Sequence, residues 1–358
     1  MHEDASIEEL KSQFKGGIVD ISSFEMQKMI GKGGFGEVWK AIHKPTNTVC
    51  AVKKLFLQES DTDNESIELY VREVKILAQM KNLFCLRLLG FSIQQPFIIV
   101  TPFIQSGSLF DYVCSHSLKP PLEPTNLTLI AMGVSYGLMK LHEMGLIHRD
   151  LKSPNILLDQ RLLPYICDFG IARQTGDRMT KDIGTTYWMA PEQMDSRHYD
   201  NKVDVYSYGC ILYEMLAHKY PYQDCTSYKA AANIMSGKRP ELPNHDPQIC
   251  SLISKCWAQD PEKRPPMRNI FKAFCKLKFQ FDNTQEKGIL ALISIICKND
   301  PKLAPKIERW TNSAKDSKTS SKKTDSKQKS SSPKETEQPS EAKKDKHHHH
   351  HHHDKEKH

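Results

Sequence analysis

The chain has 358 residues, of which 39% are hydrophobic, so it can build one ordinary core or two lobes together with tails. The net charge of +7 is unevenly placed, because residues 313–358 hold 12 Lys against 8 Asp and Glu. A near-neutral body with a mixed-charge basic tail that lacks aromatic residues argues against a nucleic-acid-binding domain.

Targeting signals are absent from the expected places. The polar, acidic start does not resemble a secretory signal, and His2 excludes N-myristoylation. The longest apolar run, 289–297, is interrupted by Ser294 and is far shorter than the roughly 20 residues of a membrane helix. The ten cysteines form no C-x-x-C pair, which favours free thiols over zinc ligands. We therefore expect a cytoplasmic protein without membrane insertion, and nuclear access stays open.

Residues 1–23 are expected to form a polar N-terminal extension. The segments 24–30, 37–42 and 49–55 then alternate in the manner of paired strands, with turn residues at 44–47. This pattern predicts a small antiparallel β-sheet at the start of the globular part.

Helical spacing follows the strands. One stripe, with Asn64 or Ser66 as its expected cap, consists of Ile67, Val71, Val74 and Leu77. A second stripe after Asn126 consists of Leu127, Ile130, Ala131, Val134 and Leu138. A small β-rich part with one helix, followed by a larger helical part, is an α+β fold with two lobes.

The predicted domain covers residues 24–276. Residues 277–312 are expected to form a helical C-terminal extension of one or two helices ending near Trp310. Residues 313–358 are rich in Lys, Ser and His and lack branched aliphatic residues, which predicts disorder. The run His347–His353 is either an expression tag or a natural low-complexity tract.

A glycine-rich segment carries the first chemical signal. It reads Gly31, Lys32, Gly33, Gly34, Phe35, Gly36, Glu37 and Val38. Glycines let a backbone turn tightly and bring its amides against phosphate oxygens. The pattern also matches a dinucleotide-binding turn, but such a turn enters a helix, whereas these glycines enter a strand pattern. A hairpin flap over phosphates is therefore favoured.

A lysine and a glutamate follow at suggestive places. Lys53 lies in the next strand, and Glu73 lies on the helical stripe. Alone, each reads as an ordinary solvated charge. Behind a glycine flap, Glu73 can instead pair with Lys53 and hold it against the α- and β-phosphates of a nucleotide.

The strongest signal is the stretch His148–Asn155, followed by Asp168–Gly170. Phosphoryl transfer needs in-line positioning, Mg²⁺ and an acceptor for the hydroxyl proton. Asp150 suits the acceptor role, and Asn155 and Asp168 offer the oxygen ligands that Mg²⁺ prefers. Lys152 can stabilise charge on the group in transfer.

In this order, the motifs resemble a eukaryotic protein kinase domain over its whole length, including Ala190-Pro191-Glu192. The resemblance implies the two-lobed kinase fold, ATP and Mg²⁺ as cofactors, and protein substrates. It further implies a pair between Glu192 and Arg264, and Asp204 as the anchor of the catalytic loop. The hydrophobic spine implied between the lobes consists of Leu77, Leu88, His148 and Phe169.

The same resemblance assigns the adenine site. Ile30 is expected to cover the base, Val38 and Ala51 are expected to bind the nucleotide, and Thr101 fits the gatekeeper position. Pro102 stands where an acidic residue is commoner, yet it keeps the carbonyl that reads adenine, and Ile104 keeps the amide.

Lys152, two positions after Asp150, resembles serine/threonine kinases, and the segment 184–192 resembles the tyrosine-kinase-like group, whose members phosphorylate mostly Ser and Thr. Arg149 is expected to receive a phosphate from the activation loop, with Thr180 as the favoured site, while Thr185 is expected to bond Asp150 and Lys152. An upstream kinase or autophosphorylation in trans would supply that phosphate.

Two alternatives remain beside an active serine/threonine kinase. A nucleotide-binding pseudokinase scaffold usually lacks one of the residues Lys53, Asp150 or Asp168, and all three are present. A dual-specificity or tyrosine kinase would be separated by the identity of the phosphorylated residue.

Overall fold

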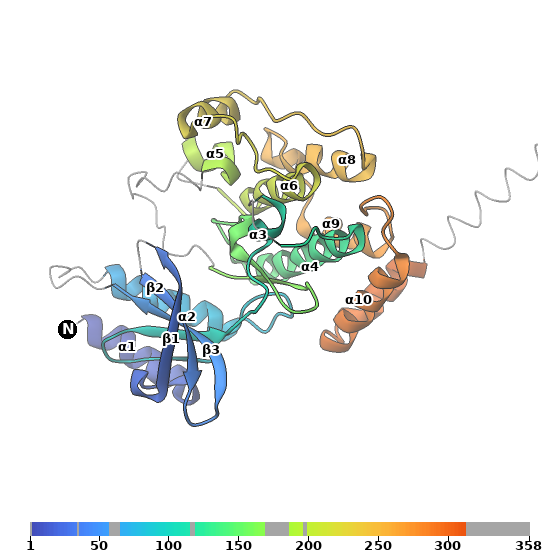
Figure 1. Cartoon of the computed structure of the whole chain (residues 1–358). Coiled ribbons are helices and arrows are strands. Elements are labelled where there is room, and N and C mark those ends of the chain that lie inside the picture. The colour runs from blue at the N-terminus through green and yellow to red at the C-terminus, as the bar shows by residue number, and fades with distance from the viewer. Residues whose placement is uncertain are drawn as a thin grey trace, which may run out of the picture. The chain divides into compact units, whose positions relative to one another are not determined.

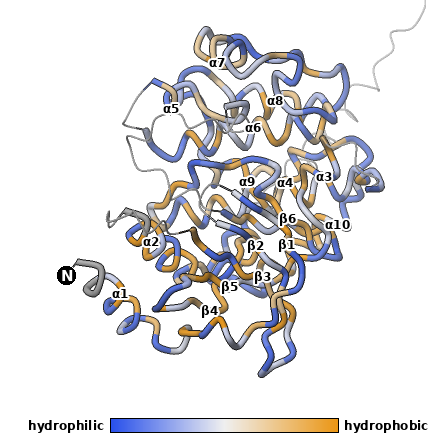
Figure 2. Tube along the Cα trace, turned by 60° about the vertical axis from the view of Figure 1, so that its left-hand side comes forward, coloured by the Kyte–Doolittle hydropathy of each residue, from blue (hydrophilic) through white to orange (hydrophobic). Residues whose placement is uncertain are grey.

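A five-stranded antiparallel sheet forms the N-terminal lobe, in the order β1-β2-β3-β5-β4 (Figure 1). Strands β1 Phe24–Gly33, β2 Gly36–His43 and β3 Thr48–Leu55 match the three predicted segments, and β4 Gly90–Phe91 and β5 Ile98–Pro102 are two further strands. Alternate side chains point to one side and form a core of Phe24, Ala41, Cys50, Val52, Ile98 and Val100. Figure 2 shows the hydrophobic residues that run along these strands.

The computed structural model describes residues 2–33, 36–56, 65–114, 119–168, 186–195 and 199–312. These lie in one unit, Met1–Ala314. Calls that fall on Gly34, Phe35, Asn64, Phe169, Thr180, Thr185 and the tail 313–358 lie outside the described residues.

The longest helix of this lobe within the described ranges is α2, Glu65–Gln79. The predicted stripe of Ile67, Val71, Val74 and Leu77 is buried, as the helical spacing requires. Ser66 lies in the first turn of α2, and its side chain is outside the described residues. Tyr70 is fully buried, and its hydroxyl donates to the carbonyl oxygen of Ser92 at 2.6 Å. The helix is thereby tied to the sheet.

The second lobe is mainly helical, which confirms the predicted two-lobed α+β fold (Figure 1). Its longest helix, α4, buries every residue of the second predicted stripe. The helices are α3 Leu109–Val113, α4 Pro124–Glu143, α5 Pro191–Asp195, α6 Lys202–Ala217, α7 Ser227–Met235, α8 Pro247–Cys256 and α9 Met267–Cys275. A short hairpin of β6, Ile156–Leu158, and β7, Pro164–Ile166, completes the lobe. None of the helices in the described ranges is long and apolar enough to cross a membrane.

The C-terminal extension packs on this lobe. Helix α10, Glu286–Asn299, buries Ile289, Leu292, Ile293 and Ile296 and contacts α4. Thr128 of α4 accepts a bond from the backbone of Phe281, and Trp310 packs edge-on against Phe271 of α9. A further helical segment covers residues 304–312, so the chain folds on past residue 276.

The N-terminal extension is also structured, which its polar composition did not predict. Helix α1, His2–Gln13, contacts α2, and Leu10 is fully buried. One apolar residue in each turn is enough to dock a polar helix when the other faces stay in water.

Candidate active site

The sheet register places three residues from three strands in one row. Gly31 pairs with Val38, and Val38 pairs with Lys53. The next row on the same face, two residues along β3, holds Ala51 opposite Thr101. Antiparallel pairing therefore gathers the glycine segment, the strand lysine and the gatekeeper position on one face of the sheet.

The glycine segment comes close to its neighbours. A Cβ at Gly36 would clash with the backbone oxygen of Lys54, so only glycine fits there. Ile30 is 46% exposed, which leaves its apolar side chain available to cover a flat base. Pro102, at the end of β5, and Ile104 just beyond it are both half-buried.

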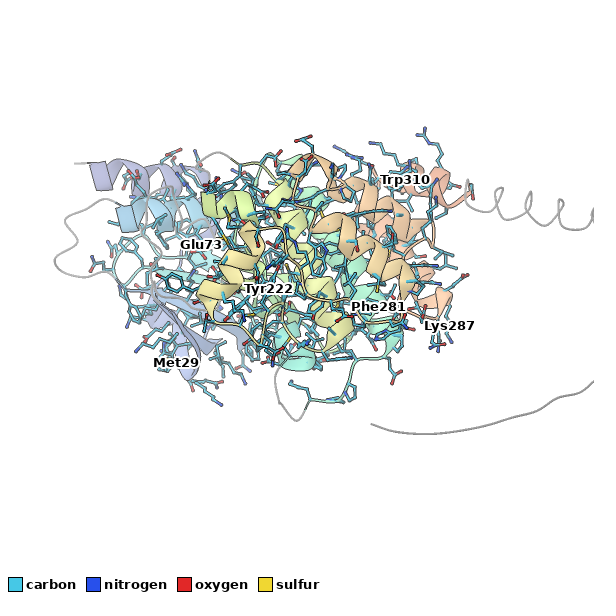
Figure 3. The ribbon with its side chains drawn as sticks, turned by 90° about the horizontal axis from the view of Figure 1, so that it is seen from above. Met29, Glu73, Tyr222, Phe281, Lys287 and Trp310 are labelled. Atoms are coloured by element: carbon cyan, nitrogen blue, oxygen red, sulfur yellow. The ribbon has the colours of Figure 1, made fainter. Side chains whose placement is uncertain are left out.

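Lys53 sits between two carboxylates. Its Nζ lies 2.8 Å from Glu73 Oε1 and 3.9 Å from Asp168 Oδ1 (Figure 3 labels Glu73). Burial by itself would lower the pKa of Lys53, but the charges of Glu73 and Asp168 outweigh it and raise the pKa to about 12. Lys53 is thus a fixed positive charge beside the glycine segment.

The loop before β6 gathers a second set of polar groups. Lys152 Nζ lies 2.9 Å from Asp150 Oδ2, and Asn155 Nδ2 donates to the backbone oxygen of Asp150 at 2.8 Å. Asp150 Oδ1 is buried and has no hydrogen-bond partner among the described residues. A buried carboxylate oxygen without a donor is costly, which indicates a position that a substrate hydroxyl can complete.

Backbone geometry at this loop is unusual. Arg149 has φ +70° and Asp168 has φ +52°, a region that non-glycine residues rarely enter. The carboxylate of Asp204 accepts the backbone amides of His148 at 2.8 Å and of Arg149 at 2.9 Å. The implied anchoring of the catalytic loop by Asp204 is present, and it explains how the strained turn is held.

Asp204 has a further partner, the side chain of His142, at 2.8 Å. Burial would raise the pKa of Asp204, but the hydrogen bond and charge of His142 lower it below its usual range. The pair implied between Glu192 and Arg264 is also present, with Nη2 at 2.9 Å from Oε2.

Sequence reasoning missed Glu214, a fully buried carboxylate in α6. It accepts hydrogen bonds from Ser153 Oγ at 2.6 Å, Trp188 Nε1 at 2.9 Å and Cys114 Sγ at 3.4 Å. Burial raises the pKa of Glu214 to about 7, although these donors lower it. A single carboxylate within the apolar run 209–217 was the available signal.

The donor set fits a nucleotide with a divalent ion. Among the described residues, no group of three or more His, Cys, Asp and Glu side chains could hold a metal alone. Asn155 and Asp168 offer two oxygen ligands, and Mg²⁺ commonly takes one or two protein ligands beside phosphate oxygens and water. The orphaned oxygen of Asp150 and the cation of Lys53 suit the hydroxyl and the phosphates of such a complex.

Known proteins are similar to this chain in sequence. A probable serine/threonine-protein kinase of Dictyostelium discoideum is 38% identical over 71% of this chain and 19% of its own length. The serine/threonine-protein kinase STY17 of Arabidopsis thaliana is 31% identical over 72% of this chain and 45% of its own length. The serine/threonine-protein kinase VIK of the same plant is 34% identical over 74% of this chain and 63% of its own length. This chain thus spans less than half of the first two relatives.

The family model described as protein tyrosine and serine/threonine kinase matches residues 24–274, which include the sheet, α2 and the loop of Asp150. The chain belongs to the protein tyrosine and serine/threonine kinase family.

Proposed function

We propose that the chain is an ATP-dependent protein kinase that phosphorylates serine or threonine in its protein substrates and uses Mg²⁺. The observation that carries this proposal is Asp150, whose Oδ2 is 2.9 Å from Lys152 Nζ while its buried Oδ1 has no partner among the described residues. A substrate hydroxyl that donates to Oδ1 would be held by the residue that takes its proton.

The roles of the other site residues follow from their charges and from the distances between them. Lys53, fixed by Glu73, binds the α- and β-phosphates, while Asn155 and Asp168 hold the metal ion. When bound, the metal ion neutralises the charge of the phosphates. Lys152 lies close enough to Asp150 to stabilise negative charge on the group in transfer.

The choice of serine or threonine rests on Lys152 and on the relatives. The resemblance of the segment 184–192 to the tyrosine-kinase-like group agrees, since that group acts mostly on these residues. The matched relatives from two organisms are named serine/threonine-protein kinases.

Regulation by the activation loop is part of the proposal. Arg149, 5.8 Å from the ring of Tyr199, supplies positive charge beside Asp150 for a phosphothreonine, with Thr180 as the favoured site. An upstream kinase or a second copy of the chain would add this phosphate, and the place of action is proposed to be the cytoplasm.

The test is transfer of labelled γ-phosphate from MgATP to a generic protein substrate, followed by hydrolysis to identify the phosphorylated residue. We expect Asp150→Asn to lower kcat by about 10²- to 10⁴-fold, since it removes the proton acceptor. The matched control is Asp224→Asn, the same change at a C-lobe carboxylate whose side chain is 87% exposed, and it should transfer phosphate at the wild-type rate.

Phosphoserine or phosphothreonine, formed by the wild type and lost only in Asp150→Asn, would support the proposal. ATP binding without transfer by any form, even after phosphorylation of the activation loop, would contradict it and favour a nucleotide-binding scaffold. Phosphotyrosine as the main product would contradict the choice of residue.

A further inference from the structure

The N-terminal helix α1 lies alongside α2, the helix that carries Glu73. Figures 1 and 3 both show these two helices side by side, and they are in contact. Leu10 of α1 is fully buried and belongs to the same hydrophobic cluster as Tyr70, Val71 and Val74 of α2. A fully buried leucine in an otherwise polar helix anchors that helix to its neighbour.

An ion pair between α1 and α2 fixes the orientation of the two helices at this contact. Glu9 Oε2 lies 2.8 Å from Lys75 Nζ, and the hydrogen bond and charge of Lys75 lower the pKa of Glu9. Lys75 is two residues after Glu73 in the same helix. The apolar contact and the ion pair therefore act on the turn of α2 that presents Glu73 to Lys53.

The segment after α1 is held by the sheet. Val19 donates its backbone amide to the carbonyl oxygen of Phe91 in β4 at 2.9 Å, and Ile18 forms a parallel bridge with Phe91. Strand β4 lies at the end of the sheet order, so this segment covers an edge that would otherwise be open. A Cβ at Gly90 would lie 2.7 Å from Val19 Cγ1 and 3.2 Å from the backbone oxygen of Gly17, so the segment lies close against the backbone of β4.

Helix α2 is thus held on two sides. Tyr70 ties it to the sheet through the carbonyl oxygens of Ser92 and Ile98, at 2.6 and 3.1 Å. Helix α1 contacts α2 on a second side, and α1 is itself followed by residues 18–19, which are bonded to the sheet. The contacting residues Glu9 and Leu10 precede residue 24, where the family resemblance begins.

We propose that residues 7–19 form a built-in positioning element of this kinase, in which Leu10 and Glu9 hold α2 so that Glu73 stays paired with Lys53. The inference rests on the proposed function, because the pair matters for activity only if the site transfers phosphate. Removal of the contact lets α2 shift, the Lys53–Glu73 distance of 2.8 Å lengthens, and Lys53 no longer holds the phosphates.

The main test compares Leu10→Ala with the wild type in the full-length chain. We expect kcat/KM to fall by about tenfold, since a modest change in the balance between two helix positions changes the active fraction by that factor. Leu10→Met, which keeps the apolar volume, should restore the wild-type value.

A double-mutant cycle separates positioning from general stability. In a Glu73→Gln background the pair is already weakened, so Leu10→Ala should cost little further activity. If Leu10→Ala lowers kcat/KM equally in both backgrounds, the helix acts only on overall stability and the proposal is wrong.

The charge pair offers a second cycle. Glu9→Lys and Lys75→Glu should each lower kcat/KM by about twofold, a modest effect because the pair is partly exposed, and the double exchange should recover it. The matched control is Glu8→Lys, because Glu8 pairs only with Lys11 of the same helix among the described contacts, and we expect it to leave kcat/KM unchanged.

Hydrogen exchange gives a readout that does not depend on activity. Leu10→Ala should speed exchange in residues 65–79 of α2 but not in residues 202–217 of α6. Unchanged exchange in α2 together with unchanged kcat/KM would overturn the inference. If the wild type transfers no phosphate at all, the proposed function fails, whereas exchange in α2 still decides whether α1 holds that helix.

Discussion

The two ends of α6 each carry a carboxylate that is fully buried, yet the two behave in opposite ways. Asp204 lies in the first turn and its pKa is lowered, while Glu214 lies near the last turn and its pKa is raised to about 7. Equal burial therefore does not decide the charge of a carboxylate. The partners of the carboxylate decide it.

The partners differ in kind. Asp204 accepts two backbone amides and faces His142, which can carry a positive charge. Among the described residues, Glu214 is bonded by neutral groups: a hydroxyl, an indole, a thiol and the backbone of Ser153. Asp204 thus works as a permanent anion that clamps the catalytic loop, whereas Glu214 can lose or gain a proton near neutral pH.

The largest effect is expected at the clamp. Asp204→Asn places an amide nitrogen against a backbone donor, and we expect the free energy of unfolding to fall by about 4 kcal/mol, as for other broken buried pairs. Urea denaturation measures it, with Asp224→Asn as the control. If the free energy of unfolding fell by less than about 1 kcal/mol, water would have taken over the hydrogen bonds of the Asp204 carboxylate. The proposed difference between a charged Asp204 and a titrating Glu214 would then be wrong.

A pH-dependent effect is expected at Glu214. Because the folded pKa of Glu214, about 7, lies above the ordinary glutamate value of 4.5, the folded state binds more protons between these values, so the contribution of Glu214 to stability falls as pH rises. From pH 4.5 to about 7, the stability of the wild type relative to Glu214→Gln should fall by about 3 kcal/mol. Urea titrations across this range check it, and a pH-independent difference would contradict an elevated pKa.

A smaller effect is expected at Trp188, whose indole donates to Glu214. Trp188→Phe removes a donor to a charged group above pH 7 but to a neutral group below pH 5. The destabilisation should therefore be about 1 kcal/mol larger at pH 8 than at pH 5.5. In the Glu214→Gln background this pH dependence should vanish, and its persistence would place the titrating group elsewhere.

Local sequence patterns predicted the buried faces of two helices and one ion pair of the site. The stripes of α2 and α4 follow from helical spacing, and the pairing of Lys53 with Glu73 followed once a strand and a helix were recognised. The pair of Glu192 and Arg264 followed from the family resemblance rather than from spacing. In each case the residue type indicates the kind of partner, since an apolar stripe needs an apolar surface and a lysine or arginine needs a carboxylate.

The contacts that were missed join distant segments through ordinary side chains. Glu214 meets Cys114 and Ser153, which lie 100 and 61 residues earlier in the chain. Leu10 lies in the same hydrophobic cluster as residues of α2, although the composition of the segment around Leu10 predicts only a polar extension. No local period reveals such a contact, because only the folded topology brings the two segments together.

The C-terminal extension decides where a recombinant fragment of this chain can end. The family match ends at residue 274, but Ile289, Leu292 and Ile296 are buried by packing that includes α4. A recombinant fragment trimmed at the end of the match would leave part of the apolar face of α4 in water and invite aggregation. The smallest well-behaved unit therefore extends through residue 312, beyond the boundary drawn by similarity to other kinases.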